Sequence, residues 1–199
     1  MTDLHPSHPG LARLLREGTH DAHRAVEAHP HQRMLLADPL ERDFLTSLLQ
    51  AMRAVHRALE HALARAAATD RRVDSMLAPH HRRSRGIDDD LEDLGSTGPS
   101  CDPPACVARY STELERVATD PPTLVGHWYV FEGATNGGRY LEPRIRAALG
   151  PGAPSRIRCF DPYGPEQVTH WHAFRDGLAH FDTDSDIRQR CLDGARAAF

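Results

Sequence analysis

One histidine, His23, lies in a segment where its neighbours at helical spacing suit a metal ligand. On a helix, a residue shares a face with those three, four and seven positions away, and for His23 these residues are Arg16, Thr19, Val26 and Glu27. The Glu27 carboxylate can accept the proton of one ring nitrogen of His23, which makes the other nitrogen a better metal ligand. A histidine and a glutamate one turn apart are also a common structural pair on helix surfaces, so this spacing alone leaves both interpretations open.

A second segment, residues 129–139 (YVFEGATNGGR), has three glycines within six positions of an apolar stretch. Each glycine costs a helix roughly 1 kcal/mol relative to alanine, so the three together indicate a kink or a surface that another group approaches closely. Close packing of a neighbouring helix explains them equally well. A helix that carries a histidine and a helix that carries glycines are what the two sides of a planar ligand would require.

Other pairs of metal-ligating residues are weaker candidates. Cys101-x4-Cys106 could begin a zinc site, but no second paired spacing accompanies it. Glu17-x-x-His20 matches one ligand unit of di-iron helical bundles, which normally use two such units and two further carboxylates. The remaining histidine pairs fit the general surplus of this residue, 14 in the chain; they are His29-x-His31, His80-His81 and His170-x-His172.

Length, composition and charge indicate one domain and exclude several classes of protein. The 199 residues are 40% apolar and 26% charged, which predicts a single domain with a sizeable core. The N-terminus MTDLHPSHPG lacks the basic start and apolar core of a signal peptide, and no apolar run is long enough for a membrane span. We therefore expect a cytoplasmic protein without membrane attachment, with flexible residues 1–9 and reduced cysteines. A net charge of −4 argues against general nucleic-acid binding.

The pattern of apolar residues predicts an all-α fold of about seven to eight helices. Alanine and leucine occur 26 and 21 times, against 8 valines and 4 isoleucines, which favours helices over strands. One helix is predicted over 11–28 and ended by Pro30, and a long one begins with Asp38 as N-cap and Pro39 in its first turn. Further helices are predicted over 80–94, 105–117, from Pro121 through the glycine-rich segment, over 166–180, and from Ser185 to the C-terminus.

Two motifs together resemble the heme oxygenases, especially the small bacterial members that produce biliverdin. LREGTHDAHRAVE (15–27) is similar to the proximal helix of that family, and YVFEGATNGGR (129–139) to its distal helix. HHRRSRGIDDDLEDL (80–94) and RQRCLDGARAAF (188–199) are similar to later helices in the same order. The resemblance covers nearly the whole chain and implies a single heme-oxygenase-like helical domain over residues 1–199. Heme would be sandwiched in it between a proximal helix and a glycine-kinked distal helix.

The resemblance also assigns residues to the proximal and distal sides of the heme. His23 matches the axial ligand of the iron, Glu27 its hydrogen-bonding partner, and Thr19 a proximal contact. Gly133 and Gly137 match the glycines that let the distal backbone lie against the heme and leave room for oxygen.

Other positions match the periphery of the heme site. Arg16 and Arg175 match cations that meet the propionates, and Phe199 matches an aromatic residue of the pocket wall. His56 falls where some members carry a tyrosine of the distal water network. The chain departs from the family at two positions, with Ala134 in place of an aspartate that organises distal water in animal members and Trp171 in place of a second propionate lysine.

The function implied by the resemblance is oxidative cleavage of heme. Heme b would be both cofactor and substrate, and O2 with external electrons would convert it to biliverdin, CO and ferrous iron. The chain has neither a dinucleotide fingerprint nor a cysteine set for an iron–sulfur cluster, so a ferredoxin or flavoprotein reductase is the implied electron donor. Supply of bilin to a bacteriophytochrome and acquisition of iron are both open as biological roles. The alternatives are a heme-binding carrier or sensor without turnover, and a di-iron oxidase on the same architecture.

Overall fold

The computed structural model describes residues 10–96 and 103–199 of the chain. Within these ranges it contains ten α-helices, three short 3₁₀-helices and no strand, which confirms the predicted all-α class. None of the helices in the described part of the chain is long and apolar enough to cross a membrane. The predictions for residues 1–9 and for Cys101 lie outside the described residues.

Residues 10–96 contain six α-helices and one 3₁₀-helix. They are α1 (Leu11–Gly18), α2 (His20–Glu27), α3 (Pro30–Leu35), α4 (Arg42–Ala67), α5 (Arg71–Met76), η1 (Pro79–His81) and α6 (Ser84–Asp93). The second half contains α7 (Ala105–Val117), α8 (Pro121–Leu149), η2 (Gly164–Glu166), α9 (Gln167–Gly177), η3 (Leu178–Phe181) and α10 (Ser185–Ala197). The helices predicted at 105–117 and from Ser185 onward agree with α7 and α10.

The predicted helix over 11–28 is wrong in its continuity. Thr19 interrupts it with φ −112° and ψ 3°, so α1 and α2 are separate helices. The Thr19 hydroxyl donates a hydrogen bond to the Leu15 carbonyl at 2.7 Å, the kind of local bond by which threonine competes with regular helical structure. The predicted end before Pro30 is confirmed, since α2 ends at Glu27 with Ala28 as C-cap. Pro30 then opens α3, where its missing N–H is not needed.

The predicted start of the long helix is also wrong. Helix α4 begins at Arg42 with Glu41 as N-cap, rather than at Asp38 and Pro39. The backbone N–H of Leu40 donates to the Ala148 carbonyl at 3.0 Å, which holds this stretch against the end of α8 and outside the helix. Two further differences concern shorter elements: α5 was not predicted, and the segment 80–94 divides into η1 and α6.

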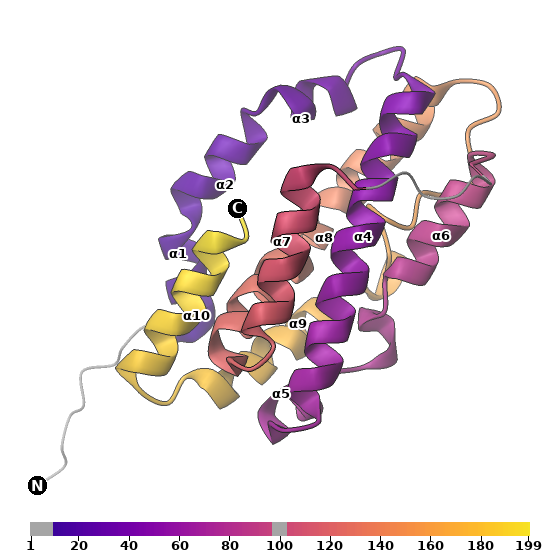
Figure 1. The fold of residues 1–199 in the computed structure, drawn as a ribbon. Coiled ribbons are helices and arrows are strands. Elements are labelled where there is room, and N and C mark those ends of the chain that lie inside the picture. The colour runs from indigo at the N-terminus through magenta and orange to yellow at the C-terminus, as the bar shows by residue number, and fades with distance from the viewer. Residues whose placement is uncertain (1–9, 97–102) are drawn as a thin grey trace, which may run out of the picture.

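The helices form a bundle around α8, with the first three helices along one side (Figure 1). Helix α4 runs beside α7, and α10 packs along α8. A Cβ atom at Gly126 of α8 would lie 2.0 Å from the carbonyl oxygen of Cys191 in α10. A Cβ at Gly194 of α10 would lie 2.0 Å from the Thr123 carbonyl oxygen. The two backbones therefore touch, and glycine at both positions makes this contact possible.

The buried side chains form two apolar clusters along the bundle. The larger one surrounds Trp128 and includes Leu15 of α1, Leu114 of α7 and Phe181 of η3. The smaller one lies near the C-terminal end of α8, around Ile145. Helix α2, by contrast, contains no buried residue, so it contributes little to either cluster.

Three buried histidines are held in their neutral form. His56, His81 and His127 are 1%, 6% and 0% exposed. Burial lowers the pKa of His81 to about 3 and that of His127 to about 4. The Nδ1 atom of His127 lies 2.9 Å from the Tyr110 hydroxyl, which can donate a hydrogen bond to the neutral ring.

We predict that His127 makes the protein less stable as the pH falls. Its pKa is lower in the folded protein than in the unfolded chain, so the unfolded chain takes up the proton first, and stability is lost between about pH 6.5 and 4. The loss for this residue is up to about 3 kcal/mol. His127→Gln, which can still accept from Tyr110, should narrow the difference in unfolding free energy between pH 7.5 and 4.5.

Urea unfolding followed by circular dichroism measures this difference. His172→Gln, at an exposed histidine, is the matched control and should keep the pH dependence of the wild type. An unchanged dependence in His127→Gln would show that the residue does not titrate as its burial implies.

Candidate functional site

His23 projects from α2 with most of its side chain accessible. The side chain is 61% exposed, and its Nδ1 atom lies 3.6 Å from Oε1 of Glu27, so the pair expected from the sequence is present. This separation is longer than a hydrogen bond, so the orientation of the ring by Glu27 that would leave Nε2 for a metal stays a prediction. The ring of Phe199 stands at 66° to that of His23, with 6.1 Å between their centroids.

The C-terminal helix positions this part of the site. Arg196 of α10 donates from Nε to the carbonyl oxygen of Gly18 at 3.1 Å, at the junction of α1 and α2. A Cβ atom at Gly18 would lie 2.4 Å from Leu192 Cδ1, so the junction packs tightly on α10. The same helix leads to Phe199, and Figure 1 shows the C-terminus beside α2. Residues from the two ends of the chain therefore meet at His23.

The four glycines of α8 have two different environments. A Cβ atom at Gly126 or Gly138 would lie 2.0 Å or 2.3 Å from a backbone carbonyl oxygen of Cys191 or Phe160, so these two glycines serve close packing. At Gly133 the nearest atom to a Cβ is Cη2 of Trp171 at 3.8 Å, and at Gly137 nothing lies within 4 Å. Close packing therefore explains Gly126 and Gly138 but not Gly133 and Gly137. Only Gly133 and Gly137 leave the α8 backbone open.

Two arginines from distant parts of the chain act on one tyrosine. Tyr129 lies one turn before Gly133 on α8, and burial raises the pKa of its hydroxyl. The charges of Arg16 on α1 and Arg175 on α9 act on the same hydroxyl and oppose that rise in its pKa. Both cations assigned to the propionates therefore lie within electrostatic range of the same residue of α8. Tyr129 was not predicted as a site residue. Its separation of four residues from Gly133 places both on the same face of a helix, and this spacing could have indicated it.

His56 and Thr19 make their contacts with other groups. His56 packs on the ring of Phe131, with 5.3 Å between centroids, and Phe131 lies two positions from Gly133, on a different side of α8. Burial and the charge of Arg83 lower the pKa of His56 well below its usual value, so the ring is neutral. Thr19 is 5% exposed, and its hydroxyl is bonded to Leu15. The roles assigned to both residues stay predictions.

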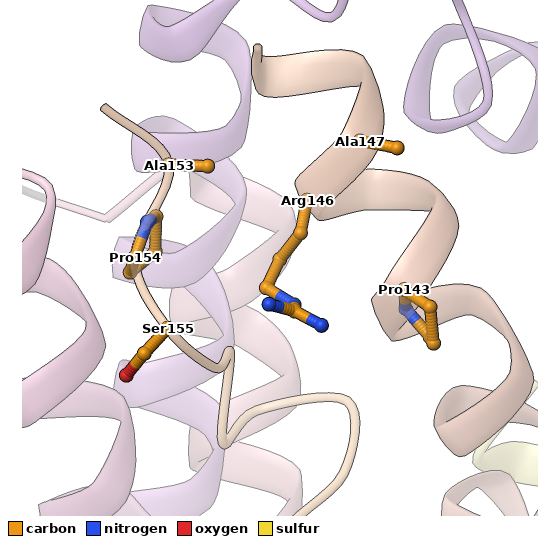
Figure 2. A pocket seen from close by; sticks show the side chains of 6 residues that line it. All are labelled: Pro143, Arg146, Ala147, Ala153, Pro154 and Ser155. Carbon is orange, nitrogen blue, oxygen red and sulfur yellow. The ribbon is translucent and has the colours of Figure 1, made fainter. Parts of the chain in front are cut away.

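Two hollows on the surface differ in their relation to this site. The hollow in Figure 2 lies near the end of α8 and is lined by Pro143, Arg146, Ala147, Ala153, Pro154 and Ser155. It contains no candidate residue, and Arg146 Nε lies 2.8 Å from Glu142 Oε1. The other hollow, beside α1, is lined by Arg13, Arg16, Glu17 and His20. Glu17 of the Glu-x-x-His unit is paired there with Arg13 at 2.7 Å.

No group of three or more His, Cys, Asp or Glu side chains that could hold a metal ion occurs in residues 10–96 and 103–199. A single histidine as the protein's ligand to an iron that is already held by four tetrapyrrole nitrogens needs no such group. The accessible His23, the open backbone at Gly137 and the cation pair at Tyr129 fit such a ligand.

These features define an all-helical protein with an exposed histidine on one helix and two open glycines on another. A family model for heme oxygenase matches residues 9–199. The chain belongs to the heme oxygenase family. No curated protein gives a significant sequence match to this chain.

Solved structures of similar fold include heme oxygenases from bacteria. Heme oxygenase-2 from Synechocystis sp. PCC 6803, in complex with heme and NO, is 24% identical with a TM-score of 0.83 over 96% of this chain and 81% of that chain. Heme oxygenase-1 from the same cyanobacterium, in complex with heme, is 21% identical with a TM-score of 0.84 over 96% and 87%. The enzyme from Leptospira interrogans is 24% identical with a TM-score of 0.78 over 96% and 95%. Because these sequence identities are below 25%, the structural similarity establishes the fold alone.

We predict that His23→Ala removes the axial ligand and leaves the fold intact, because the side chain is exposed and α2 buries no residue. Absorption spectra of the ferric and ferrous-CO heme complexes should change, while the circular dichroism of the protein without heme stays as in the wild type. His20→Ala, at an exposed histidine of the same helix, should leave the spectra unchanged. If the spectra of His23→Ala matched those of the wild type, the axial ligand would be another residue.

Proposed function

We propose that this chain binds heme between α2 and α8 with His23 as the axial ligand, and cleaves it to biliverdin, CO and ferrous iron. The observation that carries the proposal is the combination of an unburied helix with an open glycine surface. Helix α2 buries none of its residues, and a Cβ at Gly137 would meet no atom within 4 Å. A planar apolar ligand that covers both would supply the burial that the protein itself does not.

Exposed apolar side chains around α2 and α3 support the same proposal. Val26, Met34 and Leu36 are 36%, 47% and 39% exposed, and Phe199 beside His23 is 39% exposed. Single exposed apolar residues are ordinary on protein surfaces. Val26 on the helix of His23 and Phe199 beside its ring are suited to contact with a tetrapyrrole, because an apolar ligand would cover area that water contacts unfavourably.

Each residue of the site has a distinct task in the proposed reaction. The bound heme supplies a redox-active iron and the porphyrin ring that is oxidised. Glu27 orients the imidazole of His23, and Arg16 and Arg175, beside Tyr129, hold the carboxylates. Gly137 leaves space next to the α8 backbone, where oxygen and ordered water can lie. Because Ala134 has no acidic group, we propose that water delivers the protons.

The electrons come from a protein partner in this proposal. We propose a ferredoxin or flavoprotein reductase in the cytoplasm, since the sequence has no binding motif for a redox cofactor other than heme. A bacteriophytochrome that takes up the bilin, or release of iron for the cell, would give the reaction its biological role.

The direct test adds hemin to the purified protein, then ascorbate or a reductase system in air. Cleavage replaces the Soret band with the broad red absorption of biliverdin. A Soret band that persists with reductant and O2 would identify a heme carrier or sensor instead. Iron bound without heme, found by metal analysis, would favour the di-iron alternative.

We predict that Gly137→Leu reduces turnover without destabilising the protein. A Cβ there meets no neighbouring atom within 4 Å, and leucine is a better helix former than glycine by about 1 kcal/mol, so the free energy of unfolding should stay the same or rise. Biliverdin formation should fall at least about tenfold, which corresponds to about 1.4 kcal/mol of activation free energy, because the side chain fills the space for oxygen.

Ala147→Leu is the matched control, since it adds the same side chain at an exposed position of α8. It should keep the turnover of the wild type. A stable Gly137→Leu variant with unchanged turnover would contradict the placement of oxygen beside Gly137.

A further inference from the structure

Two side chains of α8 bond to backbone carbonyls in the stretch that Gly133 and Gly137 leave open. The Thr135 hydroxyl donates to the carbonyl of Glu132 at 2.7 Å. The side-chain amide of Asn136 donates from Nδ2 to the carbonyl of Gly133 at 3.2 Å. Local bonds of this kind compete with the regular bonds of a helix and can bend it. The orientation of these two side chains therefore affects the path of the backbone around the glycines.

Gln167, the first residue of α9, bonds to both side chains. Its Nε2 atom donates to Thr135 Oγ1 at 2.6 Å and to Asn136 Oδ1 at 3.3 Å. The Thr135 hydroxyl uses its single proton on the Glu132 carbonyl, so its oxygen acts as the acceptor for the glutamine. Hydrogen bonds linked in a chain strengthen one another in the protein interior. One amide group of α9 therefore directs two side chains of α8.

Burial and a neighbouring contact fix this glutamine relative to α8. Gln167 and Thr135 are both buried, so a bond lost between them would leave buried polar groups unsatisfied. The hydroxyl of Tyr163, shortly before α9, donates to Oε2 of Glu132 at 2.9 Å. The chain that leads into α9 is thus anchored to the same part of α8.

The glutamine holds α8 from the side opposite to the open glycines. Successive residues of a helix point about 100° apart, so Thr135 points away from both Gly133 and Gly137, which are two positions before and after it. Thr135 is buried, whereas Gly137 is exposed. Gln167 therefore does not enter the space beside the glycines, and it can act on that space only through the backbone.

We infer that Gln167 is a positioning residue, which fixes the α8 backbone from Gly133 to Gly137 and with it the shape of the space beside these glycines. That this space takes a diatomic ligand rests on the proposed function. Without the glutamine donors, Thr135 and Asn136 lose the bonds that orient them. The backbone around the glycines then samples several arrangements, and a diatomic ligand no longer meets one fixed surface.

The first part of the test measures backbone opening in the protein without heme. Gln167→Met removes both donors at similar size, and the backbone amides of Asn136 and Gly137 should then exchange hydrogen at least about tenfold faster by NMR, while those of α7 stay as in the wild type. Thr135→Val removes the hydroxyl at constant shape and should also speed this exchange. Thr135→Ser keeps the hydroxyl and should restore the slow exchange of the wild type.

The second part measures the ligand space without turnover. Dissociation of CO from the ferrous heme complex should be at least about fivefold faster in Gln167→Met, because the backbone no longer presents one fixed surface. The affinity for heme should stay as in the wild type. Val73→Ala is the control, since it shortens a buried side chain of α5 in the larger apolar cluster. It should destabilise the protein and leave CO dissociation unchanged.

Three results would overturn the inference. They are unchanged exchange at Asn136 and Gly137 in Gln167→Met, faster exchange that is uniform over α7 and α8, and faster exchange without faster CO dissociation. If Gln167→Met does not fold, the comparison of Thr135→Val with Thr135→Ser decides in its place, and equal exchange in these two variants overturns the inference as well.

The two parts separate this inference from the proposed function. Exchange in the protein without heme does not depend on any reaction, and CO dissociation requires bound heme but no cleavage. A wild type that binds heme and CO without forming biliverdin would contradict the proposed reaction, and faster exchange and CO dissociation in Gln167→Met would still support the role of Gln167. Biliverdin formation by the wild type, with unchanged exchange in Gln167→Met, would support the reaction and reject that role.

Discussion

The backbone contact between α8 and α10 determines where the other parts of the site lie. Gly126 and Gly194 let the two helices approach until a Cβ on either would lie 2.0 Å from a carbonyl oxygen of the other. With α10 fixed along α8, Arg196 reaches the Gly18 carbonyl, and Phe199 reaches the ring of His23. The position of α2 relative to Gly133 and Gly137 therefore depends on a contact between α8 and α10. That contact involves none of the residues of α2 and neither of these two glycines. Substitution of either glycine would displace α10 and, through it, the junction of α1 and α2.

Helix α2 carries the candidate ligand His23 but lies outside the apolar core that stabilises the protein. The two apolar clusters lie among other helices, and α2 adds no buried residue to them. A helix of eight residues has little intrinsic stability, so packing at its two ends and contact with a ligand must hold it. Bound heme should therefore stabilise this side of the molecule more than the rest, since a ligand that binds only the folded form adds to its stability.

The sequence predicted the parts of the structure that local spacing determines. The His23–Glu27 pair follows from a separation of four residues, and α7 and α10 follow from their apolar stripes. The break at Thr19 was missed because it depends on one side-chain hydrogen bond within an otherwise helical pattern. The late start of α4 was missed because it depends on a backbone bond to Ala148, more than a hundred residues away. The grouping of Arg16, Tyr129 and Arg175 is likewise a tertiary feature, which only the resemblance to a family anticipated for the two arginines.

The glycines of α8 illustrate a further limit of sequence reasoning. Each carries the same cost in helix propensity, and nothing in the local pattern separates Gly137 from its neighbour Gly138. The structure separates them by what lies opposite: the Phe160 carbonyl is 2.3 Å from a Cβ at Gly138, whereas no atom lies within 4 Å of one at Gly137. One glycine is therefore required by the protein's own packing, and the packing does not require the other. Because adjacent helical residues point about 100° apart, the same short motif can fasten α8 to the bundle on one side and expose its backbone on the other.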